Sequence, residues 1–231
     1  MKKGTVLLIL VFLLAGCGNT GDGSNMYKTE EEGNRTGVEI AKLEDVILLG
    51  NNEKEGSFNE VVVQMRDKSQ SFNWQTSNNA TYYPRVEKLD INDDGTDEIV
   101  IITTRYTGSD INVQDLHVLK SQDLTELHIE DPLTYTNQNT KSTIKKSDGI
   151  VNIHIQANSQ QVVEKIFKEE DAGLWFDEVS YINHIKYEIE DNKITATLLG
   201  AVSPSLVVAT VKIEYDQDLN AADLVITEVN N

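Results

Sequence analysis

"IKYEIEDNKITATL", residues 185–198, alternates apolar and polar side chains on both sides of a short polar run. Apolar residues stand two apart in 185–189 and again in 194–198. A period of two places them on one face of a β-strand, whereas an amphipathic helix repeats its apolar positions every three or four residues. The run "EDNK" at 190–193 supplies residues that favour a turn. This stretch therefore predicts a β-hairpin with one buried face.

The same alternation extends along most of the chain. A second hairpin is predicted across 142–156, where Ser147, Asp148 and Gly149 supply the turn. Residues 160–171, "QQVVEKIFKEED", are the one stretch that fits a helix. Further strands are predicted at 45–50, 59–65, 85–90, 98–106, 115–121 and 205–215. The predicted fold is mainly β, either an antiparallel β-sandwich or a partial-propeller-like domain.

The N-terminal segment has the pattern of an export signal. Lys2 and Lys3 precede an apolar run from Val6 to Ala15 that contains no charge. A basic start, a short apolar run and small residues after it are typical of a secretory signal peptide. A membrane-spanning helix needs about 20 apolar residues, so this run is too short to be one. We expect residues 1–16 to be a signal peptide.

Leu14-Ala15-Gly16-Cys17 resembles the lipobox of bacterial lipoprotein signals, in which small residues before a cysteine allow a dedicated peptidase to cut. The resemblance implies that Cys17 becomes the mature N-terminus and carries a diacylglyceryl group. Two acyl chains, such as palmitate, anchor a protein stably, since each buried CH₂ contributes about 0.8 kcal/mol. This places the protein on the outer face of the cell membrane, attached to the lipid bilayer. The alternative is an ordinary secreted protein in which Cys17 is incidental.

The composition limits the partners and the chemistry of the rest of the chain. Residues 17–37 contain little that can be buried and are expected to form a flexible tether. Residues 38–231 are long enough to form a β-rich extracytoplasmic domain with a real core. The formal net charge of −18 argues against nucleic acid and anionic lipid headgroups as partners. Cys17 is the only cysteine, so once it is acylated no cysteine remains for disulfides or thiol catalysis.

"DINDDGTDE", residues 90–98, has the oxygen-rich spacing of a calcium loop. Such a loop places ligands at positions 1, 3 and 5, a backbone carbonyl at 7, and a glycine at 6 for the sharp turn. Position 12, where an EF-hand has glutamate, is Ile101, and the flanking residues predict strands. The motif is therefore not an EF-hand. The candidate Ca²⁺ ligands are Asp90, Asn92, Asp94, Thr96 and Glu98, with Gly95 at the turn.

The motif resembles the Asp-rich loop of FG-GAP and VCBS-type repeats, which run Asp-x-Asn-Gly-Asp-Gly-x-x-Asp between strands. The resemblance covers residues 84–119 and is typical of surface lipoproteins of Gram-positive bacteria that carry one such repeat. It implies a structural calcium ion. Asp93 stands where the repeat has glycine, and Glu98 stands where it has aspartate.

Two alternatives apply to the acidic segments. The loop at 90–98 can instead be a plain connection whose Asp and Asn side chains accept hydrogen bonds from backbone N–H groups. A weaker copy of the motif, "DQDLNAADL" at 216–224, has Ala221 in place of the essential glycine. We interpret this second segment as a polar turn, so the motif does not repeat as a propeller requires.

No residue pattern predicts a catalytic site. The four histidines, His117, His128, His154 and His184, lie in strand-like runs without metal-ligand or nucleophile-elbow spacing. Trp74 and Trp175 are interpreted as core or rim aromatics, with a sugar-binding surface as the alternative. We expect a non-enzymatic, calcium-stabilised binding or structural module whose partner is an unknown protein or a wall polymer. The alternative is a lipid-anchored cell-wall hydrolase or a carbohydrate-binding protein.

The lipobox hypothesis predicts the effect of one substitution. Because Cys17 is the only residue that can be acylated at sulfur, Cys17→Ser should leave the chain uncut by the lipoprotein peptidase and free of lipid. Metabolic labelling with a radioactive fatty acid, followed by electrophoresis, measures this directly. Incorporation of label into the serine variant would show that the lipoprotein interpretation is wrong.

Overall fold

The computed structural model describes residues 36–108, 112–158, 161–181 and 184–229. All of them belong to one compact unit, Arg35–Asn231. The predicted signal peptide, Cys17 and the tether as far as residue 35 lie outside the described residues. In the part of the chain that is described, no helix is both long enough and apolar enough to cross a membrane.

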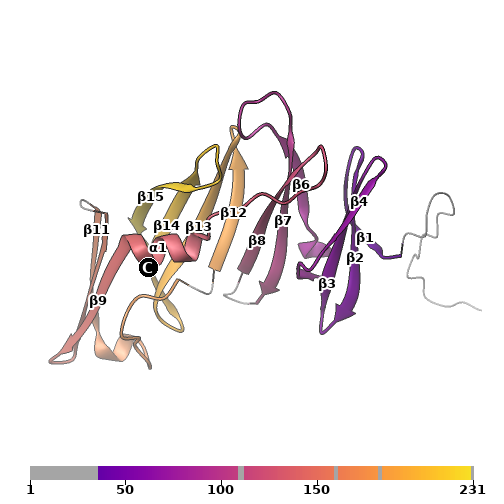
Figure 1. Ribbon diagram of the computed structural model, residues 1–231. Helices are drawn as coiled ribbons and strands as arrows, with labels where there is room; N and C mark the ends of the chain where they lie inside the picture. Colours follow the sequence, from indigo (N-terminus) through magenta and orange to yellow (C-terminus); the bar gives the residue numbers. More distant parts are fainter. Residues whose placement is uncertain (1–35, 109–111, 159–160, 182–183, 230–231) are drawn as a thin grey trace, which may run out of the picture. The chain divides into compact units, whose positions relative to one another are not determined.

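Fifteen strands build three sheets in the described residues, which confirms the mainly β, sandwich-like architecture (Figure 1). Sheet A contains β1 (Val38–Leu43), β2 (Val46–Lys54), β3 (Ser57–Met65) and β4 (Lys68–Phe72), and β5 (Thr76–Ser77) also pairs with β3. Its neighbouring strands are antiparallel throughout.

Sheet B has seven strands in the order β15-β14-β13-β12-β8-β7-β6. Its strands are β6 (Arg85–Leu89), β7 (Glu98–Thr107), β8 (Asn112–Lys120), β12 (His184–Glu190), β13 (Lys193–Ser203), β14 (Leu206–Tyr215) and β15 (Ala221–Glu228). All neighbours are antiparallel except β8 and β12, which meet in parallel over two residue pairs. The hairpin predicted at 185–198 is the β12–β13 pair, so that prediction is confirmed.

Sheet C contains β9 (Thr140–Ser147), β10 (Ile150–Ala157) and β11 (Gln161–Lys168), in the order β11-β10-β9. The hairpin predicted across 142–156 is the β9–β10 pair. The helix predicted at 160–171 is wrong, because β11 pairs with β10 over its whole length and η2 (Glu169–Asp171) follows it. β-Branched Val162, Val163 and Ile166 suit the strand, and cross-strand pairing outweighs the weak helical pattern.

The one α-helix among the described residues, α1 (Pro132–Asn139), was not predicted from the sequence. Asp131 caps its N-terminus, where the Asp131 carboxylate accepts a hydrogen bond of 3.0 Å from the backbone N–H of Thr134. Pro132 occupies the first turn, where its fixed φ and missing N–H cost nothing. The segment lacks an apolar stripe, so only the aspartate-proline start indicated a helix.

Strand β7 is buried on both faces. Ile99 and Ile101 belong to the core shared with sheet A, whereas Val100 and Ile102 belong to the core shared with sheet C and the rest of sheet B. All four side chains are at most 3% exposed. A strand covered on both faces has no polar side to alternate with, which accounts for the continuous apolar run "IVII".

A charged cluster also joins sheet A to sheet B. Lys88 on β6 lies 2.7 Å from the Glu44 carboxylate and 2.6 Å from that of Asp45, in the turn between β1 and β2. Arg66 holds the other Asp45 oxygen at 2.8 Å. The hydrogen bonds from Lys88 and Arg66 lower the pKa of Asp45 below its ordinary value. The Arg66 and Glu44 side chains are largely exposed, and pairs with such partners contribute little energy and mainly fix orientation.

The double burial of β7 predicts a large effect of truncation there. Ile101→Ala should lower the free energy of unfolding by about 2 to 5 kcal/mol, because it removes buried methyl groups and leaves a cavity between two sheets. The matched control is Ile166→Ala on β11, where the side chain is 71% exposed, and it should change stability by less than about 0.5 kcal/mol. Urea unfolding of both variants checks this prediction. Equal losses of unfolding free energy in the two variants would contradict the central position of β7.

Candidate metal centre

The predicted calcium loop, residues 90–97, connects β6 to β7 at a hairpin end where Leu89 pairs with Glu98. Gly95 has φ +84° and Asp93 has φ +57°, so both lie in the left-handed region. Glycine adopts this conformation without strain, and aspartate tolerates it better than most residues. The chain can therefore reverse direction within the loop although Asp93 stands where the FG-GAP-type repeat has glycine.

Three predicted ligands hold the loop by accepting hydrogen bonds from its backbone. The Asp90 carboxylate accepts from the N–H groups of Asp94, at 3.1 Å, and Gly95, at 2.9 Å. Asn92 Oδ1 accepts from the N–H of Asp94 at 3.0 Å, and Asp94 Oδ1 accepts from that of Thr96 at 2.8 Å. These are the Asx-type contacts of the alternative interpretation, and they also curl the backbone around the acidic side chains.

Glu98 is the buried member of the predicted ligand set. It is 3% exposed, and its Oε2 accepts a hydrogen bond of 3.1 Å from the backbone N–H of Ile91. Burial raises the pKa of Glu98 above its ordinary value, and the Asp94 and Asp90 carboxylates raise it further. The hydrogen bond from Ile91 opposes this shift. The loop therefore confines a carboxylate close to two others.

The predicted ligands lie on one loop, but their carboxylates are not gathered into a cage. Within the described residues, no group of three or more His, Cys, Asp or Glu side chains is arranged to hold a metal ion. Thr96, predicted to contribute its carbonyl, is half-buried and donates its N–H to Asp94. The oxygen-only donor set suits Ca²⁺, which accepts carboxylate, amide and carbonyl oxygens in flexible geometry. Ion binding would require the carboxylates to turn inward from their backbone partners.

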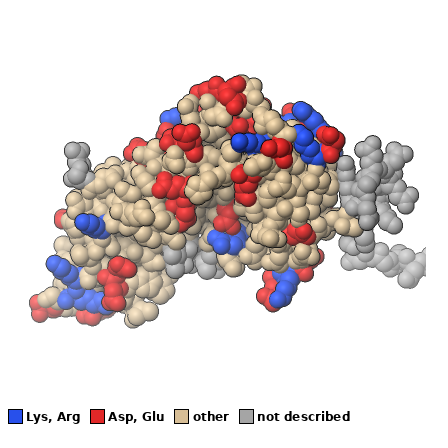
Figure 2. Space-filling model, in the orientation of Figure 1, with Lys and Arg blue, Asp and Glu red and all other residues tan. Residues whose placement is uncertain are grey.

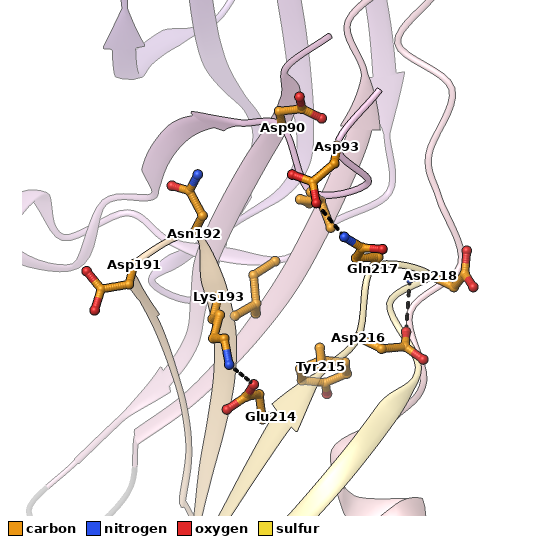
Figure 3. Close-up of a pocket in the computed structure, with 12 residues that line it drawn as sticks. Asp90, Asp93, Asp191, Asn192, Lys193, Glu214, Tyr215, Asp216, Gln217 and Asp218 are labelled. Atoms are coloured by element: carbon orange, nitrogen blue, oxygen red, sulfur yellow. Dashed lines mark hydrogen bonds and ion pairs between the residues drawn. The ribbon is translucent and has the colours of Figure 1, made fainter. Parts of the chain in front are cut away.

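The loop borders two grooves rich in acidic side chains. Red atoms gather along the upper edge of Figure 2, over the loops that join β6 to β7 and β14 to β15. One groove, of about 600 Å³, lies between the Asp90–Asp93 segment and the turns after β12 and β14 (Figure 3). The other, of about 560 Å³, is bordered by Asn92, Asp94, Glu98, Lys120, His128 and Asp218, and Lys120 is the cross-strand partner of Glu98 on β8.

The weaker copy of the motif lies beside the first. Gln217 donates a hydrogen bond of 2.6 Å to the Asp93 carboxylate, so the Asp93 side chain points to the β14–β15 turn (Figure 3). Asp216 Oδ1 accepts from the N–H groups of Asp218, at 2.9 Å, and Asn220, at 2.8 Å. Residues 216–220 thus form a polar turn, as expected, whereas the rest of the segment predicted as a turn, 221–224, begins β15. The contact of Gln217 with Asp93 joins residues far apart in the chain, and no sequence signal indicated it.

The remaining candidate residues occupy structural positions. Trp74 and Trp175 are 8% and 6% exposed, so neither indole offers an open face to a sugar ring. Trp74 stacks on His117 at 3.8 Å between ring centroids, and His117 Nδ1 lies 2.9 Å from the Glu126 carboxylate. His154 Nδ1 lies 3.2 Å from the Glu164 carboxylate on the neighbouring strand.

The other two histidines lie at different ends of sheet B. His128 borders the groove beside Glu98, and His184 begins β12. Burial lowers the pKa of His184, and Lys186 adds to this effect. The structure therefore distributes the four histidines among separate surroundings.

Comparison with known proteins adds no relative to this description. No protein-family model matches the chain, and no curated protein sequence and no solved structure matches it.

The raised pKa of Glu98 predicts a pH-dependent effect without calcium. The folded state keeps the Glu98 proton at pH values where the unfolded chain has lost it, so stability falls as the pH rises from 4.5 through the raised value. In chelator at about pH 7, Glu98→Gln should therefore be more stable than the wild type, and the difference should vanish below about pH 4. Urea unfolding at both pH values measures it.

The exposed neighbour Asp97 provides the matched control, because Asp97→Asn removes the same charge one residue earlier. It should give a smaller difference between the two pH values. A gain in stability from Asp97→Asn equal to that from Glu98→Gln would mean that net charge, rather than the burial of Glu98, is responsible.

Proposed function

We propose that this chain is a lipid-anchored extracytoplasmic lipoprotein whose β domain is a non-enzymatic binding or structural module stabilised by Ca²⁺ at residues 90–98. The observation that carries the calcium proposal is the buried carboxylate of Glu98 beside the carboxylates of Asp90 and Asp94. Two like charges close together repel each other by about 1 kcal/mol in water, and by more where water is excluded. A divalent cation removes this repulsion and supplies the missing countercharge.

The positions that depart from the FG-GAP-type pattern are compatible with an ion. Asp93 has a left-handed backbone conformation, which glycine adopts without strain, and its side chain accepts a hydrogen bond from Gln217. It therefore does not crowd the side of the loop on which Asp94 and Glu98 border a groove. Glu98 is longer than aspartate, and its position at the first residue of β7 lets it reach back to Ile91 in the loop.

The proposed ion would be structural. Asp90, Asn92, Asp94, Thr96 and Glu98 would hold it, and the ion would fix the connection between β6 and β7. Because β7 is buried on both faces, a fixed entry into this strand stabilises the packing of both cores. A ligand that binds only the folded state stabilises it by mass action, so the ion needs no catalytic role to be useful.

The proposed anchor rests on the sequence of residues 1–17. Lys2 and Lys3, the apolar run up to Ala15 and the lipobox ending at Cys17 support export and acylation. Residues 18–37 would then separate the domain from the outer face of the membrane by about 25 Å. On this proposal the partner is a protein or a wall polymer that the domain meets outside the cell.

The calcium proposal predicts a gain in thermal stability. An ion at ten times its dissociation constant stabilises the fold by about 1.4 kcal/mol, which raises the melting temperature of a domain of this size by about 3 to 5 °C. Asp94→Asn should remove most of this gain, because the substitution takes a charge from the centre of the ligand set. Calorimetry in calcium and then in chelator measures the gain.

Asp93→Asn is the matched control, since it removes the same charge from the adjacent residue whose side chain faces Gln217. This variant should keep the calcium-dependent gain. Identical melting curves of the wild type in calcium and in chelator would overturn the calcium site and leave residues 90–98 as a plain turn. An equal loss in both variants would indicate general charge screening instead.

A further inference from the structure

Sheet B consists of two antiparallel blocks that meet at a short junction. One block is β6-β7-β8 and the other is β12-β13-β14-β15. Inside each block, neighbouring strands pair over at least five residue pairs. Between the blocks, His184 pairs with Asn112 and Ile185 pairs with Val113, and this short ladder is parallel. Parallel pairing is slightly less stable per residue than antiparallel pairing. We call this junction the seam of sheet B.

Beyond these two pairs, side chains take the place of strand pairing at the seam. The backbone N–H of Tyr187 on β12 donates to Gln114 Oε1 at 2.8 Å, and the Tyr187 carbonyl accepts from the Arg85 guanidinium at 3.2 Å. Asn112 has a buried Oδ1 without a hydrogen-bond partner among the described residues. Folds open locally between cooperative units, so the seam is where opening should require the least free energy. The large core includes residues of both blocks, which therefore stay packed while the seam loosens.

A strap of chain, residues 124–131, connects the two blocks at one end. The backbone N–H of Leu127 donates to the carbonyl of Val118 on β8 at 2.8 Å. Three residues later, the N–H of Glu130 donates to the carbonyl of Leu219 in the β14–β15 turn at 3.1 Å. The strap therefore holds the β14–β15 turn of one block close to the other block.

Both acidic grooves lie between the two blocks at this end. The groove beside Glu98 is bordered by the loop at 90–97, the strap and the β14–β15 turn. The other groove is bordered by the same loop and by the turns after β12 and β14. Loop and turn already touch, because Gln217 donates to the Asp93 carboxylate at 2.6 Å (Figure 3). A ligand between the loop and the turn would therefore contact both blocks.

Three carboxylates from the two blocks border the groove beside Glu98. Asp94 and Glu98 belong to the first block, and Asp218 belongs to the turn of the second. Glu98 is 3% exposed, and only its Oε2 has a hydrogen-bond partner, the N–H of Ile91, which leaves Oε1 without one. The Asp218 carboxylate has no hydrogen bond or ion pair among the described contacts, since only its backbone N–H donates. Lys120, the cross-strand partner of Glu98, supplies one positive charge.

The charges across this groove depend on a cation for their sign of interaction. Without an ion, the carboxylates of the two blocks repel each other, which favours separation of the turn from the loop. A divalent cation between them converts this repulsion into attraction. Ca²⁺ takes six to eight oxygen ligands, whereas the loop at 90–98 offers five residues as ligands. Its coordination therefore leaves room for an oxygen from a second segment.

We propose that the cation at residues 90–98 also takes the Asp218 carboxylate as a ligand, clamps the two blocks of sheet B together and restrains the seam. The inference rests on the proposed calcium site and assigns it a regulatory role. The β14–β15 turn and β12 belong to one block, so a turn fixed on the loop restrains β12 against β8. The width of both grooves then depends on the calcium concentration.

Hydrogen exchange of the full chain in non-ionic detergent, with calcium or with chelator, tests the clamp. Mass spectrometry of peptic peptides locates the change. Peptides from β9 and β10 in sheet C report the general gain in stability, because sheet C is not part of either block. Calcium should slow exchange in peptides that cover 184–190 and 216–220 at least about threefold more than in those of sheet C, since these two segments lie at the seam and at the clamp.

The test variant is Asp218→Asn, which removes the charge of the second block and leaves the ligands of the loop in place. It should abolish the excess slowing at 184–190. The matched control is Asp223→Asn, which removes the same charge from an exposed position of β15 that does not border the groove. This control should keep the excess slowing.

Three results would overturn the clamp. They are equal slowing of all peptides by calcium, an excess slowing that persists in Asp218→Asn, and an equal loss in both variants, which would indicate charge screening. Calorimetry of the same samples separates the clamp from the calcium site. A calcium-dependent rise in melting temperature without excess slowing at 184–190 would refute the clamp and leave the calcium site standing, whereas the absence of both effects would refute both proposals.

Discussion

The burial of β7 on both faces is the constraint on which the rest of the structure depends. Ile99 and Ile101 face sheet A, while Val100 and Ile102 face the larger core. Sheet A has its own strand pairing, and its apolar side packs on β7 and β8, with Leu124 after β8 and Val86 of β6 completing the same core. A one-residue slip of β7 would exchange the two sets of side chains and disturb both cores together. The residue at which the chain enters β7 therefore matters more for stability than the entry residue of a strand with one solvated face.

The loop at 90–97 sets the residue at which β7 begins. Its acidic side chains lie next to a buried position, where negative charge is unfavourable. Alternation along β7 places Glu98 on a buried side, where its charge is unfavourable and where Asp90 and Asp94 add to the cost. A proton on Glu98 or a bound cation relieves this conflict. A proton removes one charge, whereas a divalent cation compensates two and also binds the neighbouring oxygens. On the calcium proposal, the cation would be the more effective solution at neutral pH, because protonation becomes more costly as the pH rises.

Much of the fold was predictable because most strands have one solvated face. The hairpins at 185–198 and 142–156 and the predicted strands up to residue 121 follow from the alternation of apolar and polar side chains. The helix predicted at 160–171 failed because "QQVVEKIF" fits both periods, and only pairing with β10 decides between them. The helix α1 has no apolar stripe to reveal it. At the candidate site, spacing located the loop, but the contact between Asp93 and Gln217 depends on tertiary structure alone.

The separation of charge also follows from how the sheets are assembled. Acidic turns gather where the β6–β7 and β14–β15 connections meet, whereas β9 carries three lysines and no acid at the far edge of the assembly. Because these regions share no side-chain contacts among those described, changes in one should alter the other little, as is usual for well-separated sites. On the calcium proposal, a cation at residues 90–98 would then stabilise the strand that holds both cores together without altering sheet C.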